Sequence, residues 1–176
     1  MGVSTGRDMP MQLHDVALAG FAALMAAAAF EDFRRFTIPN PLTIAIGLLW
    51  PLSFAAPPGL YPVLADLACG LVVFAAGALL FARGWLGGGD VKLLSVSALW
   101  AGPDLLPALL IATGILGGVL GLLLVSPVGG QLAGAARRLL GAAHPLPAIG
   151  GSSTPVPYGV AIAGAALIVV VPPHFA

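Results

Sequence analysis

Long apolar stretches recur along this chain, and they limit its fold more than any other feature. A helix that crosses a bilayer needs about 20 predominantly apolar residues. Six stretches approach this length, separated by segments that are polar or rich in glycine and proline. We therefore predict an all-α membrane protein, a bundle of six transmembrane helices in one domain over residues 1–176. The expected helices cover residues 14–31, 41–57, 63–82, 91–101, 105–125 and 156–173.

The composition agrees with lipid as the main solvent. Of the 176 residues, 59% are hydrophobic and only 8% are charged, with a mean hydropathy of +1.03, values outside the range of a soluble domain. Seven basic residues balance seven acidic ones, so charge gives no reason to expect a nucleic-acid partner. The single cysteine, Cys69, excludes a disulfide framework or a CxxC cluster within the chain. The three histidines lack the spacing of metal ligands, so we expect no metal and no other cofactor.

The basic residues predict an orientation in the membrane. If the helices alternate in direction, the connections after the first, third and fifth helices share one side. Six of the seven basic residues fall there, and the positive-inside rule makes that side cytoplasmic and puts the N-terminus outside. A rival interpretation, in which the first stretch is a cleaved secretory signal, would export two of these arginines against the rule. The six residues are Arg34, Arg35, Arg83, Lys92, Arg137 and Arg138.

Two further segments have sequence patterns that predict how they pack: the expected helix over 105–125 and the segment over 131–143. Glycines in the fifth expected helix form two overlapping GxxxG spacings, which favour close packing of helix backbones. Residues 131–143 form an amphipathic segment that we expect to lie on the inner membrane surface. The sequence assigns no function to this segment or to the rest of the 127–153 connection. The glycines are Gly114, Gly117, Gly118 and Gly121.

Placing a carboxylate near the membrane core costs free energy, so each carboxylate found there is a candidate functional group. Asp66 lies about one turn inside the outer end of the third expected helix, and we interpret it as structural. Asp32 ends the first helix and Asp90 opens the fourth, both on the cytoplasmic side. At the same depth these two could meet. A close pair of carboxylates shares a proton, so that one can activate water while the other protonates a leaving group.

The glycines at 87–89 bear on how Asp90 would work. A backbone without side chains lets an extended substrate approach closely, and the positive end of a helix dipole favours ionised Asp90 as the base. The spacing allows a structural interpretation equally well, in which Asp90 only caps its helix and Glu31 and Asp32 pair with the neighbouring arginines. A phosphate-binding loop is excluded because Lys92 follows the aspartate.

Three short motifs follow one another at the expected helix ends. Asp32 precedes Ile38-Pro39-Asn40, Gly87-Gly88-Gly89-Asp90-Val91-Lys92-Leu93-Leu94 opens the fourth helix, and Pro157-Tyr158-Gly159-Val160-Ala161-Ile162-Ala163 opens the sixth. Together, in this order, they resemble the type IV prepilin peptidase family of GxGD-type aspartic membrane peptidases. The resemblance extends from about Asp15 to Val171.

The resemblance implies a site and a substrate. Asp32 and Asp90 match the two catalytic aspartates, at the cytoplasmic face of a bacterial inner membrane. The implied partner is a prepilin or pseudopilin, a membrane-inserted helix whose short basic leader is cut off after a glycine. Glu31 competes with Asp32, but the distance to the Ile-Pro-Asn motif fits the family when it is counted from Asp32. The other matching residues are expected to support the site or bind substrate: Gly87, Gly88, Gly89, Lys92, Pro39, Asn40, Pro157, Tyr158 and Gly159. On a helix, Lys92 should project to a different face from Asp90.

The small size resembles the short form of the family that serves tight-adherence, Flp-type pili. Bifunctional members also carry an N-terminal segment with paired CxxC motifs and methylate the new terminus. With one cysteine and no such segment, this chain is expected to be a peptidase without N-methyltransferase activity. Two alternatives remain open. A serine intramembrane protease would use residues 150–153, and a small transporter or pilus-assembly subunit would bind protons or cations at Asp32, Asp66 and Asp90.

Overall fold

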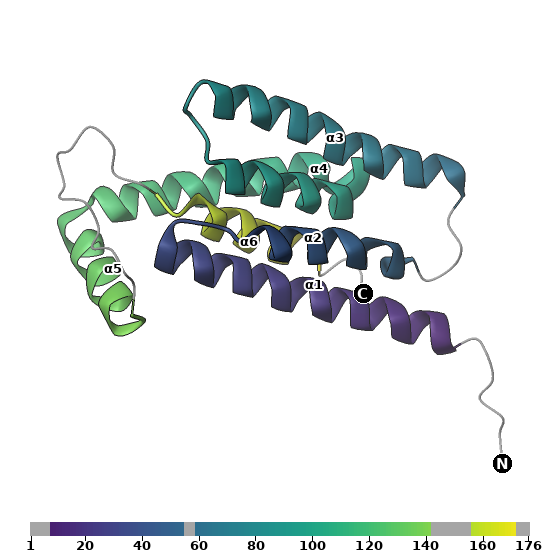
Figure 1. The fold of residues 1–176 in the computed structure, drawn as a ribbon, viewed down its shortest axis with the longest axis horizontal. Helices are drawn as coiled ribbons and strands as arrows, with labels where there is room; N and C mark the ends of the chain where they lie inside the picture. The colour runs from purple at the N-terminus through teal and green to yellow at the C-terminus, as the bar shows by residue number, and fades with distance from the viewer. Residues whose placement is uncertain (1–7, 55–58, 142–155, 172–176) are drawn as a thin grey trace, which may run out of the picture.

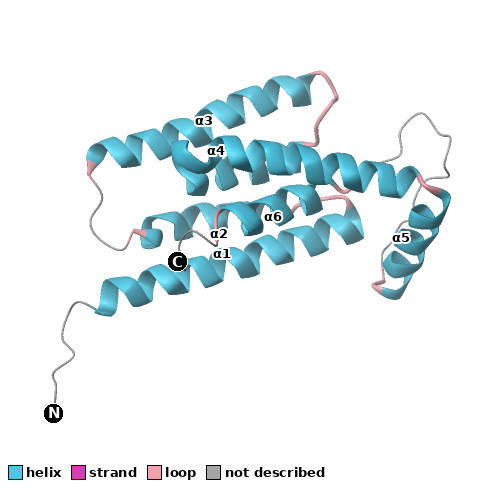
Figure 2. Ribbon diagram, turned by 180° about the vertical axis from the view of Figure 1, so that it is seen from behind, coloured by secondary structure: helices cyan, strands magenta, loops and turns pink. Residues whose placement is uncertain are grey.

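The computed structural model describes residues 8–54, 59–141 and 156–171, and every regular element in these ranges is helical. The all-α fold class is therefore confirmed. Most helices lie side by side in an elongated bundle, and α5 lies across one end of it (Figures 1 and 2). The elements are α1 (Asp8–Arg35), α2 (Asn40–Leu49), the 3₁₀ helix η1 (Trp50–Ser53), α3 (Leu60–Ala82), α4 (Gly88–Val125), α5 (Pro127–Leu139) and α6 (Tyr158–Val169).

The long helix α4 is two helical arms joined at Gly102. This residue has a φ of 59° and a ψ of −175°, a conformation that glycine adopts without steric cost, and Pro103 follows it without an N–H group. Asp66 of α3 lies directly against Gly102, where a Cβ atom would come within 2.5 Å of Oδ1. The predicted break between the fourth and fifth helices falls at this kink.

The two arms of α4 run in opposite directions. The first arm, 88–101, starts near Ile38 and ends with its Trp100 side chain bonded to α2. The second arm, 103–125, returns, because Gly117 packs against Tyr158 at the first turn of α6. That turn also touches Asp32 through Gly159. Gly102 and Asp66 therefore mark one end of the bundle, and Asp32 and the start of α4 mark the other.

Within the described ranges, three helical segments are long and apolar enough to cross a membrane: Leu13–Arg35, Leu60–Ala82 and Gly88–Val125. The helix α6 is apolar but has only 12 residues, and α2 has only 10. Six transmembrane helices, with the expected orientation, thus remain a prediction.

The second helix is shorter than expected because of Pro51. We expected a helix over 41–57. In the structure the α-helix α2 ends at Leu49, and the short 3₁₀ helix η1 follows it. Pro51 has no N–H for the Gly47 carbonyl, and the Trp50 N–H bonds to that carbonyl instead. The Ile46 carbonyl accepts a hydrogen bond from the indole of Trp100 at 2.9 Å. This bond joins the end of α2 to the first arm of α4. Residues 55–57 lie outside the described part of the chain.

Small side chains make α6 the inner helix of the bundle. It packs against both α1 and α4, and its buried positions are mostly alanine, which lets the neighbouring backbones come close. Larger apolar side chains from α1 and α4 fill the remaining space. The fully buried residues of this core include Leu18, Phe21 and Met25 of α1, Leu93, Ala98 and Leu109 of α4, and Ile162, Ala163, Ala165 and Ala166 of α6.

Only one of the four glycines in the GxxxG pattern serves close packing within the described part of the chain. A Cβ at Gly117 would overlap the ring of Tyr158. At Gly114, Gly118 and Gly121 an added Cβ would meet no described atom within 4 Å. The pattern therefore marks a single contact between α4 and α6 in this protein, at the end of the bundle where Asp32 lies.

Replacing Gly117 with alanine is expected to lower the midpoint of thermal unfolding in detergent micelles. The new methyl group would force the Tyr158 ring to move, and overpacking of this kind costs about 1–3 kcal/mol. The matched control is Gly118→Ala on the same helix, where the substitution should be neutral or gain up to about 1 kcal/mol from helix propensity. Equal midpoints for the two variants would contradict the packing described here.

Candidate active site

Asp32 lies in the last turns of α1 and is buried, with 4% of its surface exposed. Its carboxylate faces the first turn of α6, where the backbone N–H groups of Gly159 and Val160 point toward it. A helix N-terminus offers unpaired N–H groups and a positive dipole, so it suits a carboxylate. The approach requires glycine, since a Cβ at position 159 would come within 2.8 Å of the Asp32 Oδ2 atom.

Asp90 lies in the first turn of α4, and its carboxylate folds back onto the backbone of Gly87. A Cβ at position 87 would lie 2.7 Å from Asp90 Oδ2 and would push the carboxylate out of this position. An acidic side chain that accepts from the N-cap N–H is half of a capping box. The helix-capping interpretation of Asp90 stays a prediction, and the same carboxylate faces a pocket that it shares with Asp32.

The three sequence motifs meet at one side chain, Ile38. It is buried, and a Cβ at Gly89 would lie 3.2 Å from it. On its other side, a Cβ at Gly159 would come within 2.8 Å of its Cδ1 atom. The starts of α4 and α6 therefore both pack on Ile38. The second and third motifs contact Ile38 through glycines, Gly89 and Gly159. Because these glycines have no side chains, the three motifs can lie close together although they are distant in the sequence.

A pocket of about 260 Å³ opens at this meeting point. Asp32 and Asp90 both line it, and their negative charges interact. The volume is enough for several water molecules, each of which occupies about 30 Å³ in the liquid. Carboxylates from two helices thus face one small polar space. The other lining residues are Phe36, Thr37, Ile38, Asn40, Gly87, Gly88, Gly89 and Lys92.

Lys92 also lines this pocket, although positions 90 and 92 point to different faces of the helix. Its Nζ atom donates a hydrogen bond of 2.9 Å to Oδ1 of Asn40 at the start of α2. The long side chain spans the angle that separates positions 90 and 92 on the helix. Pro39 is the extended N-cap of α2, with a φ of −62° and a ψ of 134°. It positions Asn40 but does not line the pocket.

The third motif supports the site without lining the pocket. Pro157 is buried and forms the N-cap of α6. Tyr158 is half-buried and packs against Gly117 of α4. Neither side chain lines the pocket. Their contacts fix the start of α6, which presents its N–H groups to Asp32.

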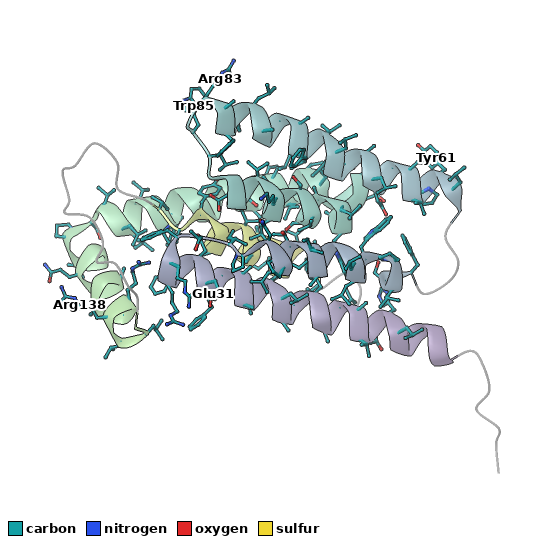
Figure 3. The ribbon with its side chains drawn as sticks, viewed as in Figure 1. Glu31, Tyr61, Arg83, Trp85 and Arg138 are labelled. Carbon is teal, nitrogen blue, oxygen red and sulfur yellow. The ribbon has the colours of Figure 1, made fainter. Side chains whose placement is uncertain are left out.

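Glu31 and Asp66 are separated from the pair. Glu31 forms an ion pair of 3.2 Å with Arg35, one turn along α1, and it does not line the pocket. Asp66 lies beside Gly102 at the opposite end of the bundle. Figure 3 shows Glu31 at the end of the bundle near α5, far from Tyr61 at the start of α3. The candidate serine loop at 150–153 lies outside the described residues.

Sequence reasoning missed Arg137, which the structure buries to 2% exposure on α5. It donates to the backbone carbonyls of Phe33 and, at 3.0 Å, of Arg34, both at the C-terminal end of α1. Its guanidinium lies 4.0 Å from the centroid of the Phe36 ring. Burial lowers the pKa of Arg137 from its ordinary value, and the nearby Asp32 carboxylate acts in the opposite direction.

Arg137 therefore fastens α5 to the end of α1 that carries Asp32. The last carbonyls of a helix lack partners within the helix, and Arg137 supplies donors to two of them. In return, Arg34 Nη2 donates to the Gly141 carbonyl just after α5, at 3.5 Å. The amphipathic segment expected over 131–143 overlaps this helix, which ends at Leu139, and residues 142 and 143 lie outside the described residues. The helix starts earlier than expected, at Pro127, because Ser126 caps it by accepting from the Gly129 N–H at 3.1 Å.

The family model described as the type IV leader peptidase family matches residues 19–122 of this chain. The matched stretch contains Asp32, Asp90 and most of α4, and it ends before the motif at 157–159. No curated protein and no solved structure matches the chain.

Replacing Arg137 with methionine should destabilise the protein by roughly 1–3 kcal/mol, because partly buried carbonyls at the end of α1 would lose their donors. The matched control is Arg138→Met, since Arg138 is exposed on the same helix (Figure 3) and surface substitutions usually change stability by about 0.5 kcal/mol or less. Thermal unfolding in detergent micelles measures both. An Arg137→Met protein as stable as the control would show that the contact does not hold α5 in place.

Proposed function

Because the chain belongs to the type IV leader peptidase family, we propose that it is an aspartic endopeptidase that uses Asp32 and Asp90 to remove the leader of a prepilin. Membership makes the chain a membrane protease with a prepilin as its general substrate. The observation that carries the aspartic mechanism is the pocket that both carboxylates face. Resemblance to the short, tight-adherence form makes an Flp-type prepilin the first substrate to test.

The proposed reaction needs one base and one acid. We assign the base to Asp90, which is the less buried of the two. It takes a proton from a water molecule, whose oxygen attacks the carbonyl carbon of the scissile peptide bond. Asp32 then donates a proton to the leaving nitrogen as the carbon–nitrogen bond breaks. The first turn of α6, which lies against the Asp32 carboxylate at Gly159, keeps this carboxylate at the pocket during both steps.

The distribution of charge supports an active site at the cytoplasmic face. All six lysine and arginine residues of the described ranges lie on segments at the pocket end of the bundle. Figure 3 shows two of them, Arg83 and Arg138, at the same end as Glu31. Positive charge of this kind favours the cytoplasmic side of a bacterial inner membrane. The start of α1 lies at the other end, which corresponds to an N-terminus outside.

The alternative of a transporter or assembly subunit is less well supported. It would require Asp66 to bind protons or cations together with Asp32 and Asp90. Asp66 lies beside Gly102, at the end of the bundle away from the pocket. The three carboxylates do not form one site, whereas two of them share a pocket.

Asp32→Asn and Asp90→Asn should each leave the protein folded and lower leader cleavage at least about a hundredfold, because asparagine keeps the size of the side chain but cannot exchange the proton. The assay is a gel shift of candidate prepilins in membranes. The matched control is Glu31→Gln, which removes the neighbouring carboxylate from its pair with Arg35 and should retain activity. Normal cleavage by either asparagine variant would refute the aspartate pair, and an inactive Glu31→Gln protein would move the chemistry to Glu31.

A further inference from the structure

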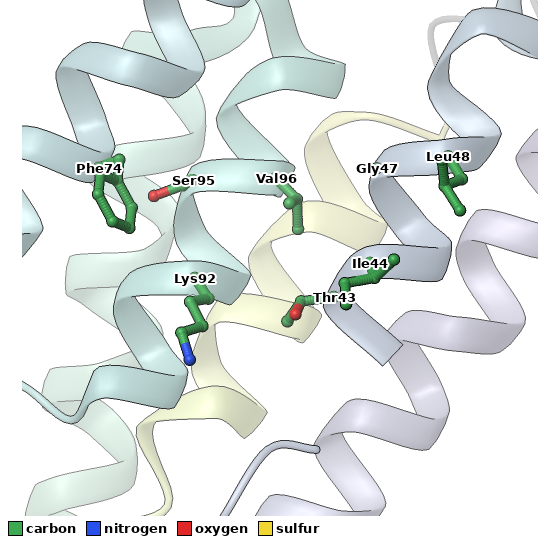
Figure 4. Close-up of a pocket in the computed structure, with 8 residues that line it drawn as sticks. All are labelled: Thr43, Ile44, Gly47, Leu48, Phe74, Lys92, Ser95 and Val96. Atoms are coloured by element: carbon green, nitrogen blue, oxygen red, sulfur yellow. The ribbon is translucent and has the colours of Figure 1, made fainter. Parts of the chain in front are cut away.

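An apolar groove runs along the outside of the bundle next to the candidate active site (Figure 4). It has a volume of about 460 Å³ and lies between α2 and α3, with the first arm of α4 as its floor. Ile44 and Leu48 of α2 form one wall, Phe74 of α3 forms the other, and Val96 belongs to the floor. Ile44 and Leu48 expose 58% and 72% of their surface. Large apolar side chains are thus left uncovered along a concave surface.

The groove and the pocket that holds the two aspartates are neighbours. Lys92 lines both spaces, and the hydrogen bond from its Nζ atom to Asn40 joins α4 to α2 where the two spaces meet. Thr43, in the groove, is tied to the same point because its Oγ1 atom donates to the Asn40 carbonyl at 3.0 Å. On one side of this boundary the surface is polar and carries carboxylates, and on the other side it is apolar.

The shape of the groove fits a helix. Its lining residues recur four positions apart on two helices, as Ile44 and Leu48 on α2 and as Lys92 and Val96 on α4. Such pairs lie one above the other on a helix face, so the groove runs along the helices and away from the aspartates. The helices α2 and α3 do not pack as a pair, and an apolar helix could enter sideways from the lipid.

We propose that this groove binds the apolar helix of the substrate, in the segment that follows the scissile bond. The proposal rests on the function proposed above, in which the bond lies between a polar leader and an apolar helix. The polar leader would therefore lie at the polar pocket and the apolar helix at the apolar groove, and the two spaces meet at Lys92. With the helix in the groove, its first peptide bond lies at Asp32 and Asp90, and Ile44 and Phe74 contact its apolar side chains.

Crosslinking tests the occupant directly. A photoreactive amino acid is placed at Ile44 in the Asp90→Asn protein, with a prepilin inserted in the same membranes. The control position is Ile115 on the second arm of α4, which is the same residue type, is 61% exposed and does not line the groove. We expect crosslinks from position 44 to the apolar helix of the prepilin and few from position 115. Crosslinks to lipid alone, or equal yields at both positions, would overturn the proposal.

Filling the groove gives a second, independent readout. Ile44→Trp should lower kcat/KM for a prepilin at least tenfold, while Ile115→Trp should leave it unchanged. If the wild-type protein cleaves and both tryptophan variants cleave equally well, the groove proposal fails and the peptidase assignment stands. If the wild-type protein cleaves no prepilin, the peptidase assignment fails. The groove is then judged by the crosslinks alone, which need no cleavage.

Discussion

Contact between glycine backbone and the Ile38 side chain holds this end of the bundle together. Gly89 and Gly159 both lie against Ile38, at distances such that a Cβ on either glycine would force Ile38 to shift. The first contact draws the start of α4 to the end of α1, and the second draws the start of α6 to the same place. Asp32 and Asp90 face one pocket because these backbones can approach so closely.

The rest of the bundle keeps those contacts in register. The reversal at Gly102 sends the second arm of α4 back toward the pocket, where Gly117 receives the ring of Tyr158 and fixes the start of α6. At the end of α1, Arg137 bonds to carbonyls that the helix itself cannot satisfy. The pocket therefore depends on contacts among α1, α4, α5 and α6. The helix α3 packs along α4, with Phe81 against Gly88 at the edge of the pocket.

Much of this arrangement could be predicted from the sequence, because the relevant signals are local. The apolar stretches predicted an all-α fold, the break after residue 101 predicted the reversal in α4, and the alternation of the expected helices predicted that Asp32 and Asp90 could meet. The early end of α2 was missed, since it depends on Pro51 together with an indole donor from Trp100. Arg137 was missed for a related reason. Its partners are backbone carbonyls about a hundred positions earlier, and no side-chain pattern encodes them.

The short helix α2 has a consequence for the surrounding bilayer. Its ten residues extend about 15 Å at 1.5 Å per residue, against a hydrocarbon thickness of about 30 Å. The neighbouring helix α3 has 23 residues and meets the full thickness. Lipids adapt to a short apolar wall by thinning, so we expect a local depression of the membrane beside α2. Headgroups and water would then lie nearer to the aspartates, and a polar leader would reach them without crossing a full leaflet of acyl chains.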